Sequence, residues 1–256
     1  MNRMTLSITL CAASLAASAA LAADLTAAQI VDKNVAARGG LEAWRAVNTI
    51  TMSGEMDAGG KQDATLPFVL GMKRAHKRRL EIRFQDQTAV QTYDGKQGWK
   101  FRPYLGRDDA EPLTPVELKS ASVADELDGP LVDYAKKHTK IELQGMEKVE
   151  GKNAYKLKLI MVGGAQRNLW LDASSFLEVK IDGEPRKLDG RPHKVVVFYR
   201  DYKTVSGLNL PHTLETAVEG VKQTHKMTLK SVTVNKPMED SLFAKPVPSA
   251  AKSSAF

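Results

Sequence analysis

Residues 66–84 read LPFVLGMKRAHKRRLEIRF, and this stretch decides the fold class. Apolar residues occupy every second position on both sides of a basic turn, first from Leu66 to Met72 and again from Leu80 to Phe84. Side chains of a strand point alternately to two faces, so this spacing predicts strands with one apolar and one polar face.

The same period of two recurs along most of the chain. It begins at Ile50–Met56, and an Asp94-Gly95 turn joins two further strand patterns at 89–93 and 98–102. After a gap it returns at residue 141 and continues, with turns, to Val234. The pattern predicts a mainly β protein with helices (α+β) and about eleven antiparallel strands in a single large domain.

Two helical segments interrupt the strand pattern. The first is predicted to run from a cap at Asp24 or Thr26 to about Ala37, before two glycines. The second begins at Thr114-Pro115-Val116-Glu117, a capping box with proline at the first helical position. It is interrupted at 128–130 and is predicted to resume over 131–137, giving an inserted helical pair.

A long meander must cover its apolar face, and few helices are available to do so. If the sheet curls, its inner face can be either an ordinary packed core or a partly empty pocket for an acyl chain. In the second case the insert is a lid. The predicted lining consists of Leu66, Phe68, Leu70, Leu80, Ile82, Phe84, Trp99 and Phe101. The predicted lid residues are Val116, Val123, Leu127 and Leu131.

The first 22 residues have the layout of a cleaved signal peptide. A short positive start precedes an apolar run, and Ala20-Leu21-Ala22 offers small residues for the peptidase. The single cysteine, Cys11, lies inside this segment, so no disulfide or cysteine-ligated metal is expected in the mature chain. We therefore predict a soluble periplasmic protein, in a compartment where nucleic acid is an improbable partner.

No motif predicts catalysis, a metal or a cofactor. The five histidines are scattered, without the spacing of a zinc site. No nucleophile elbow, phosphate-binding loop or dinucleotide-binding glycine pattern is present in the sequence. We therefore expect a protein that is not an enzyme and that holds neither metal nor cofactor.

Residues 73–79 form the densest basic cluster of a chain with a net charge of +7. Such a run is either a solvated turn or a docking surface for anionic headgroups or a membrane-bound partner. Alternation sends Arg79, Glu81 and Arg83 away from the apolar face, which fits a solvent-exposed surface.

Several short motifs, in order, resemble the LolA-like superfamily of outer-membrane lipoprotein-sorting proteins. Residues 73–81, followed by YDGKQGW at 93–99 and Pro103, resemble its "KRP … DGK..W … P" region, with Ala75 where the family has proline. Further likeness lies at LDGPLVDY (127–134), YKTVSGLNLP (202–211), VNKP (234–237) and FAKP (243–246).

The resemblance implies an open, curved antiparallel half-barrel over 23–245, with helices in its concave face. The tail at 246–256 is rich in Pro, Ala and Ser, a composition that predicts an unstructured segment. The resemblance also implies a periplasmic carrier or binder of a lipid or lipoprotein acyl chain. We expect a monomer, with inner- or outer-membrane proteins as further partners. The lid-contacting arginine of the family falls on Arg74. The alternative is a non-enzymatic envelope assembly or protein-interaction module with a packed core.

Overall fold

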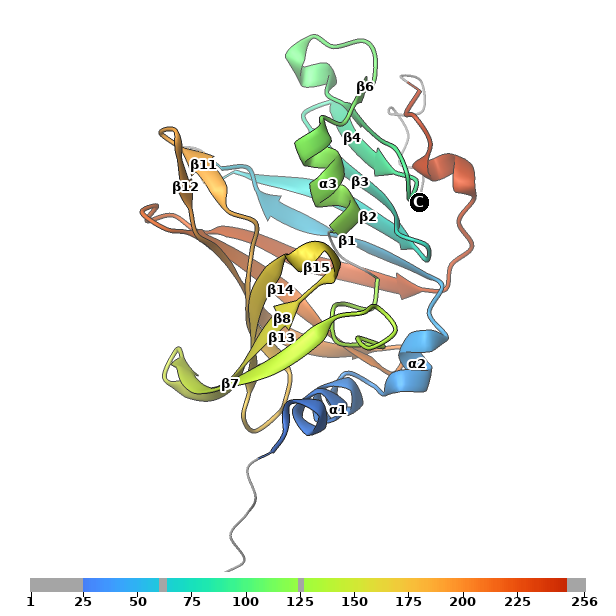
Figure 1. Cartoon of the computed structure of the whole chain (residues 1–256). Helices are drawn as coiled ribbons and strands as arrows, with labels where there is room; N and C mark the ends of the chain where they lie inside the picture. Colours follow the sequence, from blue (N-terminus) through green and yellow to red (C-terminus); the bar gives the residue numbers. More distant parts are fainter. Residues whose placement is uncertain (1–24, 60–63, 124–126, 248–256) are drawn as a thin grey trace, which may run out of the picture.

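The computed structural model describes residues 25–59, 64–123 and 127–247, except for the side chains of residues 122 and 123 (Figure 1). The expected signal peptide at 1–22 lies outside the described residues. So does the expected unstructured tail at 246–256, apart from Pro246, which is buried, and Val247, which is exposed.

One antiparallel sheet of thirteen strands dominates the described part of the chain, in the order β6-β5-β4-β3-β2-β1-β15-β14-β13-β10-β9-β8-β7. Its first half consists of β1 (Thr49–Asp57), β2 (Thr65–Lys73), β3 (Lys77–Phe84), β4 (Gln87–Tyr93), β5 (Gly98–Phe101) and β6 (Glu111–Pro112). Its second half consists of β7 (Lys140–Val149), β8 (Lys152–Ile160), β9 (Gln166–Asp172), β10 (Glu178–Asp182), β13 (Val195–Val205), β14 (Leu208–Val218) and β15 (His225–Val234). A separate ribbon pairs β11 (Arg186–Leu188) with β12 (Arg191–His193).

The mainly β class is confirmed, but the predicted count of about eleven strands is too low. The two-residue strand β6 is too short to show any periodicity. The strands β11 and β12 have three residues each and mostly exposed side chains, so they leave no apolar alternation in the sequence.

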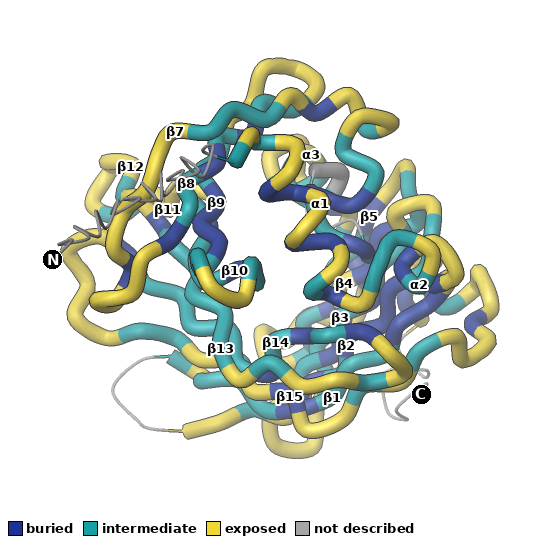
Figure 2. The backbone as a smooth tube through the Cα atoms, turned by 90° about the horizontal axis from the view of Figure 1, so that it is seen from below, coloured by how far each residue is buried: buried dark blue, intermediate teal, exposed yellow. Residues whose placement is uncertain are grey.

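The sheet is an open half-barrel whose two edges are joined by the insert. The first strand, β1, pairs with the last, β15, which places β6 at one edge and β7 at the other. Figure 2 shows the strands following one another round an arc from β7 to β5, with α1 (Ala27–Ala37) and α3 (Pro115–Val123) on the inside. We call residues 113–139, which connect β6 at one edge to β7 at the other, the insert; its helix α3 lies inside the arc.

The predicted N-terminal helix is confirmed as α1. Thr26 caps α1 in a capping box with Gln29. The chain then leaves the helix through Gly39 and Gly40, both with positive φ, and a side chain at Gly39 would collide with the Gly207 carbonyl, 2.4 Å from its Cβ. The short helix α2 (Leu41–Arg45) follows, with Trp44 fully buried.

The insert holds one helix and not the predicted pair. Thr114 and Glu117 form the expected capping box at the start of α3. Residues 131–138 form successive turns instead of a second helix. Asp133 and His138 adopt positive φ, a conformation that a right-handed helix cannot contain.

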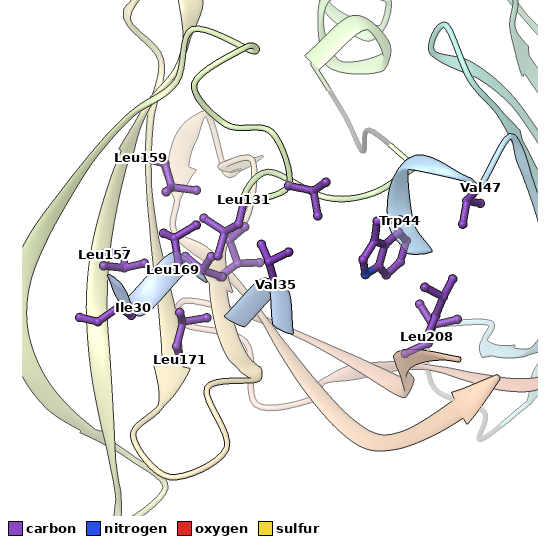
Figure 3. Close-up of a cluster of buried hydrophobic side chains, with 14 of the residues drawn as sticks. Ile30, Val35, Trp44, Val47, Leu131, Leu157, Leu159, Leu169, Leu171 and Leu208 are labelled. Carbon is purple, nitrogen blue, oxygen red and sulfur yellow. The ribbon is translucent and has the colours of Figure 1, made fainter. Parts of the chain in front are cut away.

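The main core lies between α1 and the second half of the sheet. Ile30 and Val31 of α1 are buried, and so is Leu131 of the insert. They pack against inward side chains of β8 and β9 in one cluster (Figure 3). The labelled members from these strands are Leu157, Leu159, Leu169 and Leu171. This half of the concave face is therefore filled by the chain itself.

The C-terminal segment, Lys236–Val247, covers the outer face of β3 and β4 and contains the 3-10 turn η3 (Asp240–Phe243). Phe243 is fully buried there. Arg79 and Glu81 do point outward, but they are buried beneath the segment and bonded to each other at 2.7 Å. The predicted solvent exposure of this face is therefore wrong for these two residues, because the sequence does not show that its own C-terminus returns to cover them.

Candidate functional site

The structure brings five of the eight predicted lining residues together on the concave face. Strand register pairs Phe68 with Ile82 and Leu70 with Leu80, and Leu66 lies two residues before Phe68 on the same face of β2. Phe68 and Leu70 are buried in a second apolar cluster, separate from the main core, while Leu80 and Ile82 are half-buried against it. These side chains form an apolar inner wall in the first half of the sheet.

Phe84 lies at the end of this wall. Its ring is 42% exposed and packs edge-on against Tyr104, with ring centroids 6.2 Å apart. Tyr104 belongs to η1 (Pro103–Leu105), the 3-10 turn after β5. Phe84 is therefore a rim residue of the concave face.

Trp99 and Phe101 lie on the opposite face from Leu80. Phe101 pairs with Val90, and Val90 pairs with Glu81, which points outward. The inward position on β5 is held by Lys100 instead. The prediction that both rings share the inner face is wrong, because the turn at 94–97 sets which positions of β5 point inward, and alternation within one strand does not reveal this.

A pocket of about 160 Å³ lies between the inner wall and the insert, with Leu80, Ile82, Lys100, Tyr104 and Glu117 among the residues that line it. Lys100 Nζ lies 2.7 Å from both Glu117 carboxylate oxygens, so α3 is attached to the sheet at this point. Burial alone would raise the pKa of Glu117, but hydrogen bonds from Lys100 and from Thr114 outweigh it and lower the pKa to about 2.

The four predicted lid residues differ in position. Leu131 is fully buried in the main core, and Leu127 is half-buried in contact with both apolar clusters. Val116 is 76% exposed, so it does not cover the inner wall. The side chain of Val123 lies outside the described part of the structure. Leu127 is thus the lid residue that the structure places over the junction of the two clusters.

Arg74 lies where β2 ends and reaches across to both α2 and the insert. Its guanidinium donates to the carbonyl oxygens of Trp44 and Val47, both at 2.6 Å, at the C-terminal end of α2. A third hydrogen bond, of 2.8 Å, goes to the carboxylate of Asp128 in the insert. Carbonyls at a helix C-terminus carry partial negative charge, so a cation is favoured here.

Asp128 is the centre of this contact. Its side chain is 4% exposed, and Lys137 Nζ lies 2.6 Å from its second carboxylate oxygen. The backbone carbonyl of Asp128 accepts a hydrogen bond of 2.9 Å from Arg38, whose guanidinium also lies 3.4 Å from the Glu178 carboxylate. We call these residues, Arg38, Arg74, Asp128 and Lys137, the latch. In the sequence, Asp128-Gly129-Pro130 indicated only a break in a helix, so three members of the latch were not predicted.

Four cations of the basic cluster at 73–79 form ion pairs within the chain. Lys73 and Lys77 both bond to Asp240 of the C-terminal segment, and Arg79 bonds to Glu81. Lys73 and Lys77 share Asp240, and Arg74 shares Asp128 with Lys137, so the cluster keeps part of its positive charge. The two interpretations, a solvated turn and a docking surface, stay predictions that these contacts do not test.

The described residues contain no group of three or more His, Cys, Asp or Glu side chains arranged to hold a metal ion. In the same part of the chain, no helix has the length and apolar character needed to cross a bilayer.

No family model and no curated protein matches the sequence. Solved structures do match. A LolA superfamily protein from Nitrosomonas europaea is 15% identical with a TM-score of 0.55, and the match covers 87% of this chain and 99% of that one. A Vibrio parahaemolyticus domain named as an outer membrane lipoprotein-sorting protein is 14% identical with a TM-score of 0.55, covering 84% and 94%.

The chain has the LolA-like fold. A DUF1329 family protein from Desulfovibrio piger shares it, at 14% identity and a TM-score of 0.56, with 86% of this chain and 97% of that one covered. The predicted resemblance is thereby confirmed at the level of the fold. At these identities the likeness concerns the arrangement of the LolA-like half-barrel and not its ligand.

Proposed function

We propose that the protein is a periplasmic carrier or binder of a lipid or lipoprotein acyl chain, held against the inner wall of the half-barrel. The observation that carries this proposal is an apolar inner wall beneath an insert that the latch attaches through polar contacts. The LolA superfamily and lipoprotein-sorting names of the structural neighbours support it.

The physical basis is the cost of an acyl chain in water, about 0.8 kcal/mol for each exposed methylene. A carrier must replace water with continuous apolar surface. Leu70, Leu80 and Ile82 offer such a surface, and half-buried Met52 and Met56 pack beside them, where flexible side chains can adapt to a ligand.

The described arrangement corresponds to a closed state. A dry cavity of roughly 150 Å³ holds a molecule the size of benzene, so the 160 Å³ pocket is too small for a long acyl chain. Uptake therefore requires the insert to move away from the wall. Movement of α3 and Asp128 breaks the Arg74 and Lys137 contacts to Asp128 and the Lys100 contact to Glu117, while Leu131, further along the same insert, stays in the main core.

Binding of a fluorescent fatty acid tests the proposal. Ile82→Asp places a carboxylate on the inner wall, where it is poorly solvated, and we expect the affinity to fall by about tenfold or more. The matched control is Thr88→Asp on the adjoining strand, which points to the outer face because it pairs with Arg83. This control should bind the probe like the unmodified protein.

Equal loss of affinity in both variants, with both folded by circular dichroism, would contradict an inner binding wall. Native mass spectrometry of the protein as purified gives an independent result. Co-purified lipid supports the carrier. A ligand-free protein that also fails to take up the probe supports the packed envelope module instead.

A further inference from the structure

One end of the half-barrel gathers most of the exposed apolar side chains. Strand pairing brings together the β3–β4, β8–β9 and β14–β15 turns, the β5–β6 connection and the ribbon β11–β12, all at the end away from Arg74. We call this the distal end. Large exposed apolar side chains occur there in four of these connections: Phe84, Tyr104, Leu105, Val162 and Val221.

This distribution is not expected of an inert surface. Exposed apolar residues are normally scattered over all sides of a protein, whereas five of the eight large ones that the described residues expose lie in connections at this end. Leu105 is 53% exposed and Val162 is 70% exposed, so neither is merely the rim of a packed core. Tyr104 adds an aromatic ring with a polar tip, a combination that suits the boundary between water and a bilayer.

The ribbon β11–β12 adds positive charge to the same end. It projects from the sheet on the side away from α2 (Figure 1). Arg186, Lys187 and Arg191 are exposed, and within the described residues none of the three forms an ion pair or a side-chain hydrogen bond. The acidic residue between them is Asp189, while Glu184 is bonded to Arg167, so the ribbon carries a net positive charge.

Lys73 and Lys77 pair with Asp240 and Arg79 pairs with Glu81, whereas the three ribbon cations have no ion-pair partner among the described residues. We propose that the distal end docks on an anionic lipid surface. The ribbon binds headgroups while Phe84, Tyr104 and Leu105 enter the interface beside the inner wall. Anionic bilayers attract each basic side chain near the surface, and exposed apolar side chains add binding by leaving water.

A lipid surface is the partner that fits best, because exposed apolar side chains and unpaired cations lie together in several separate turns at this end. This surface goes beyond acyl-chain carriage, and Ile82→Asp, whose inner wall should not hold an acyl chain, separates docking on a vesicle from uptake of its lipids. The probe is co-sedimentation with vesicles of phosphatidylcholine alone and of phosphatidylcholine mixed with phosphatidylglycerol. We expect binding to the mixed vesicles, weakened by salt as surface charges are screened.

The test variant is Arg186→Glu/Lys187→Glu/Arg191→Glu. The matched control is Lys148→Glu/Lys152→Glu/Lys203→Glu, which makes the same change in net charge at exposed positions of the opposite end. The ribbon variant should lose about tenfold or more in vesicle binding, and the control much less. Phe84→Ser/Leu105→Ser should weaken binding and make the remainder more sensitive to salt.

Three results would overturn the proposal: no binding of the unmodified protein to mixed vesicles, equal binding to both vesicle types, or equal loss in ribbon and control variants. Failure of vesicle binding together with self-association at the distal end would assign the surface to a second copy. The ribbon variant should still bind the soluble fatty-acid probe, and Ile82→Asp should still dock. Each proposal can therefore fail without the other.

Discussion

Asp128 is a buried carboxylate that depends on cations from distant parts of the chain. Arg74 approaches it from the end of β2, and Lys137 from the far side of the insert. Burying an unpaired charge costs free energy, so Asp128 stabilises the observed position of the insert only while its cationic partners stay in contact with it. Because these contacts are polar, water can replace them in the movement proposed above, whereas water cannot replace the apolar contacts of Leu131.

Substitution of Arg74 tests the latch. Arg74→Leu removes three donated hydrogen bonds but leaves Lys137 on Asp128, so we expect a loss of about 1–2 kcal/mol in the free energy of unfolding. The closed state has no room for the lipid, so closure favours its release. Arg74→Leu weakens the closed state, and transfer of a bound fluorescent lipid to acceptor vesicles should therefore slow. Arg74→Lys keeps the positive charge but loses the planar set of N–H donors of the guanidinium. Its stability and transfer rate should lie between those of Arg74→Leu and the unmodified protein.

The control is a double-mutant cycle with Asp128→Asn. If Arg74 and Asp128 act through each other, the double variant should cost less than the sum of the two single variants. Additive effects on both stability and transfer, or transfer rates that coincide for all variants at high salt, would contradict the latch.

Single residues show where prediction from the sequence stops. Arg74 could be singled out because the motif around it resembles a known family, and its position at a strand end followed from the alternation before it. Arg38 and Lys137 carry no such signal, because Asp128, which both contact, is 90 and 9 residues away from them in the sequence. Contacts between residues this far apart leave no local sequence pattern.

An ion pair attaches the helix α3 to the sheet. Glu117 bonds to Lys100 on β5 and also caps the helix through Thr114. Its depressed pKa means that the folded state favours the charged form. The resulting stabilisation is complete above the ordinary carboxyl pKa of 4.5 and is lost as the pH falls toward about 2.

We therefore expect Glu117→Gln to lower the free energy of unfolding at neutral pH, and the difference from the unmodified protein to disappear between pH 4.5 and about 2. Urea unfolding at a series of pH values measures this. Glu239→Gln is the control, because Glu239 is exposed and forms no ion pair in the described structure. A difference that persists unchanged at low pH would show that the ion pair does not attach the helix.

Elements were predicted better than their relative placement. The capping signals at Thr26 and Thr114 located the starts of α1 and α3, because those signals are local hydrogen bonds. The inward direction of β5 was missed for the opposite reason: it depends on the length of a turn and on pairing with β4. Residues 131–138 failed as a helix because tertiary contacts of Leu131 and Asp133 override a weak helical preference.

At the scale of the whole molecule, the two faces of the sheet are covered by different parts of the chain. The helix α3 of the insert lies inside the arc, on the concave side, and the C-terminal segment covers the outer side of β3 and β4. The outer cover buries the Arg79–Glu81 pair and bonds Arg79 to the Leu242 carbonyl at 3.0 Å. This arrangement lets the inner wall remain accessible while the same strands are stabilised from behind.

Phe243 anchors that outer cover, because its side chain is fully buried where η3 meets the sheet. Phe243→Ala removes a large buried ring, and we expect the free energy of unfolding to fall by about 3–5 kcal/mol. Val247→Ala, in the same segment but 59% exposed, should change it by less than about 0.5 kcal/mol. Fatty-acid binding by folded Phe243→Ala should match the unmodified protein, since the ring lies behind the wall and not on it. If Phe243→Ala lowers the free energy of unfolding no more than Val247→Ala does, the C-terminal segment does not stabilise the sheet. If Phe243→Ala stays folded but loses fatty-acid binding, the outer cover determines the shape of the inner wall.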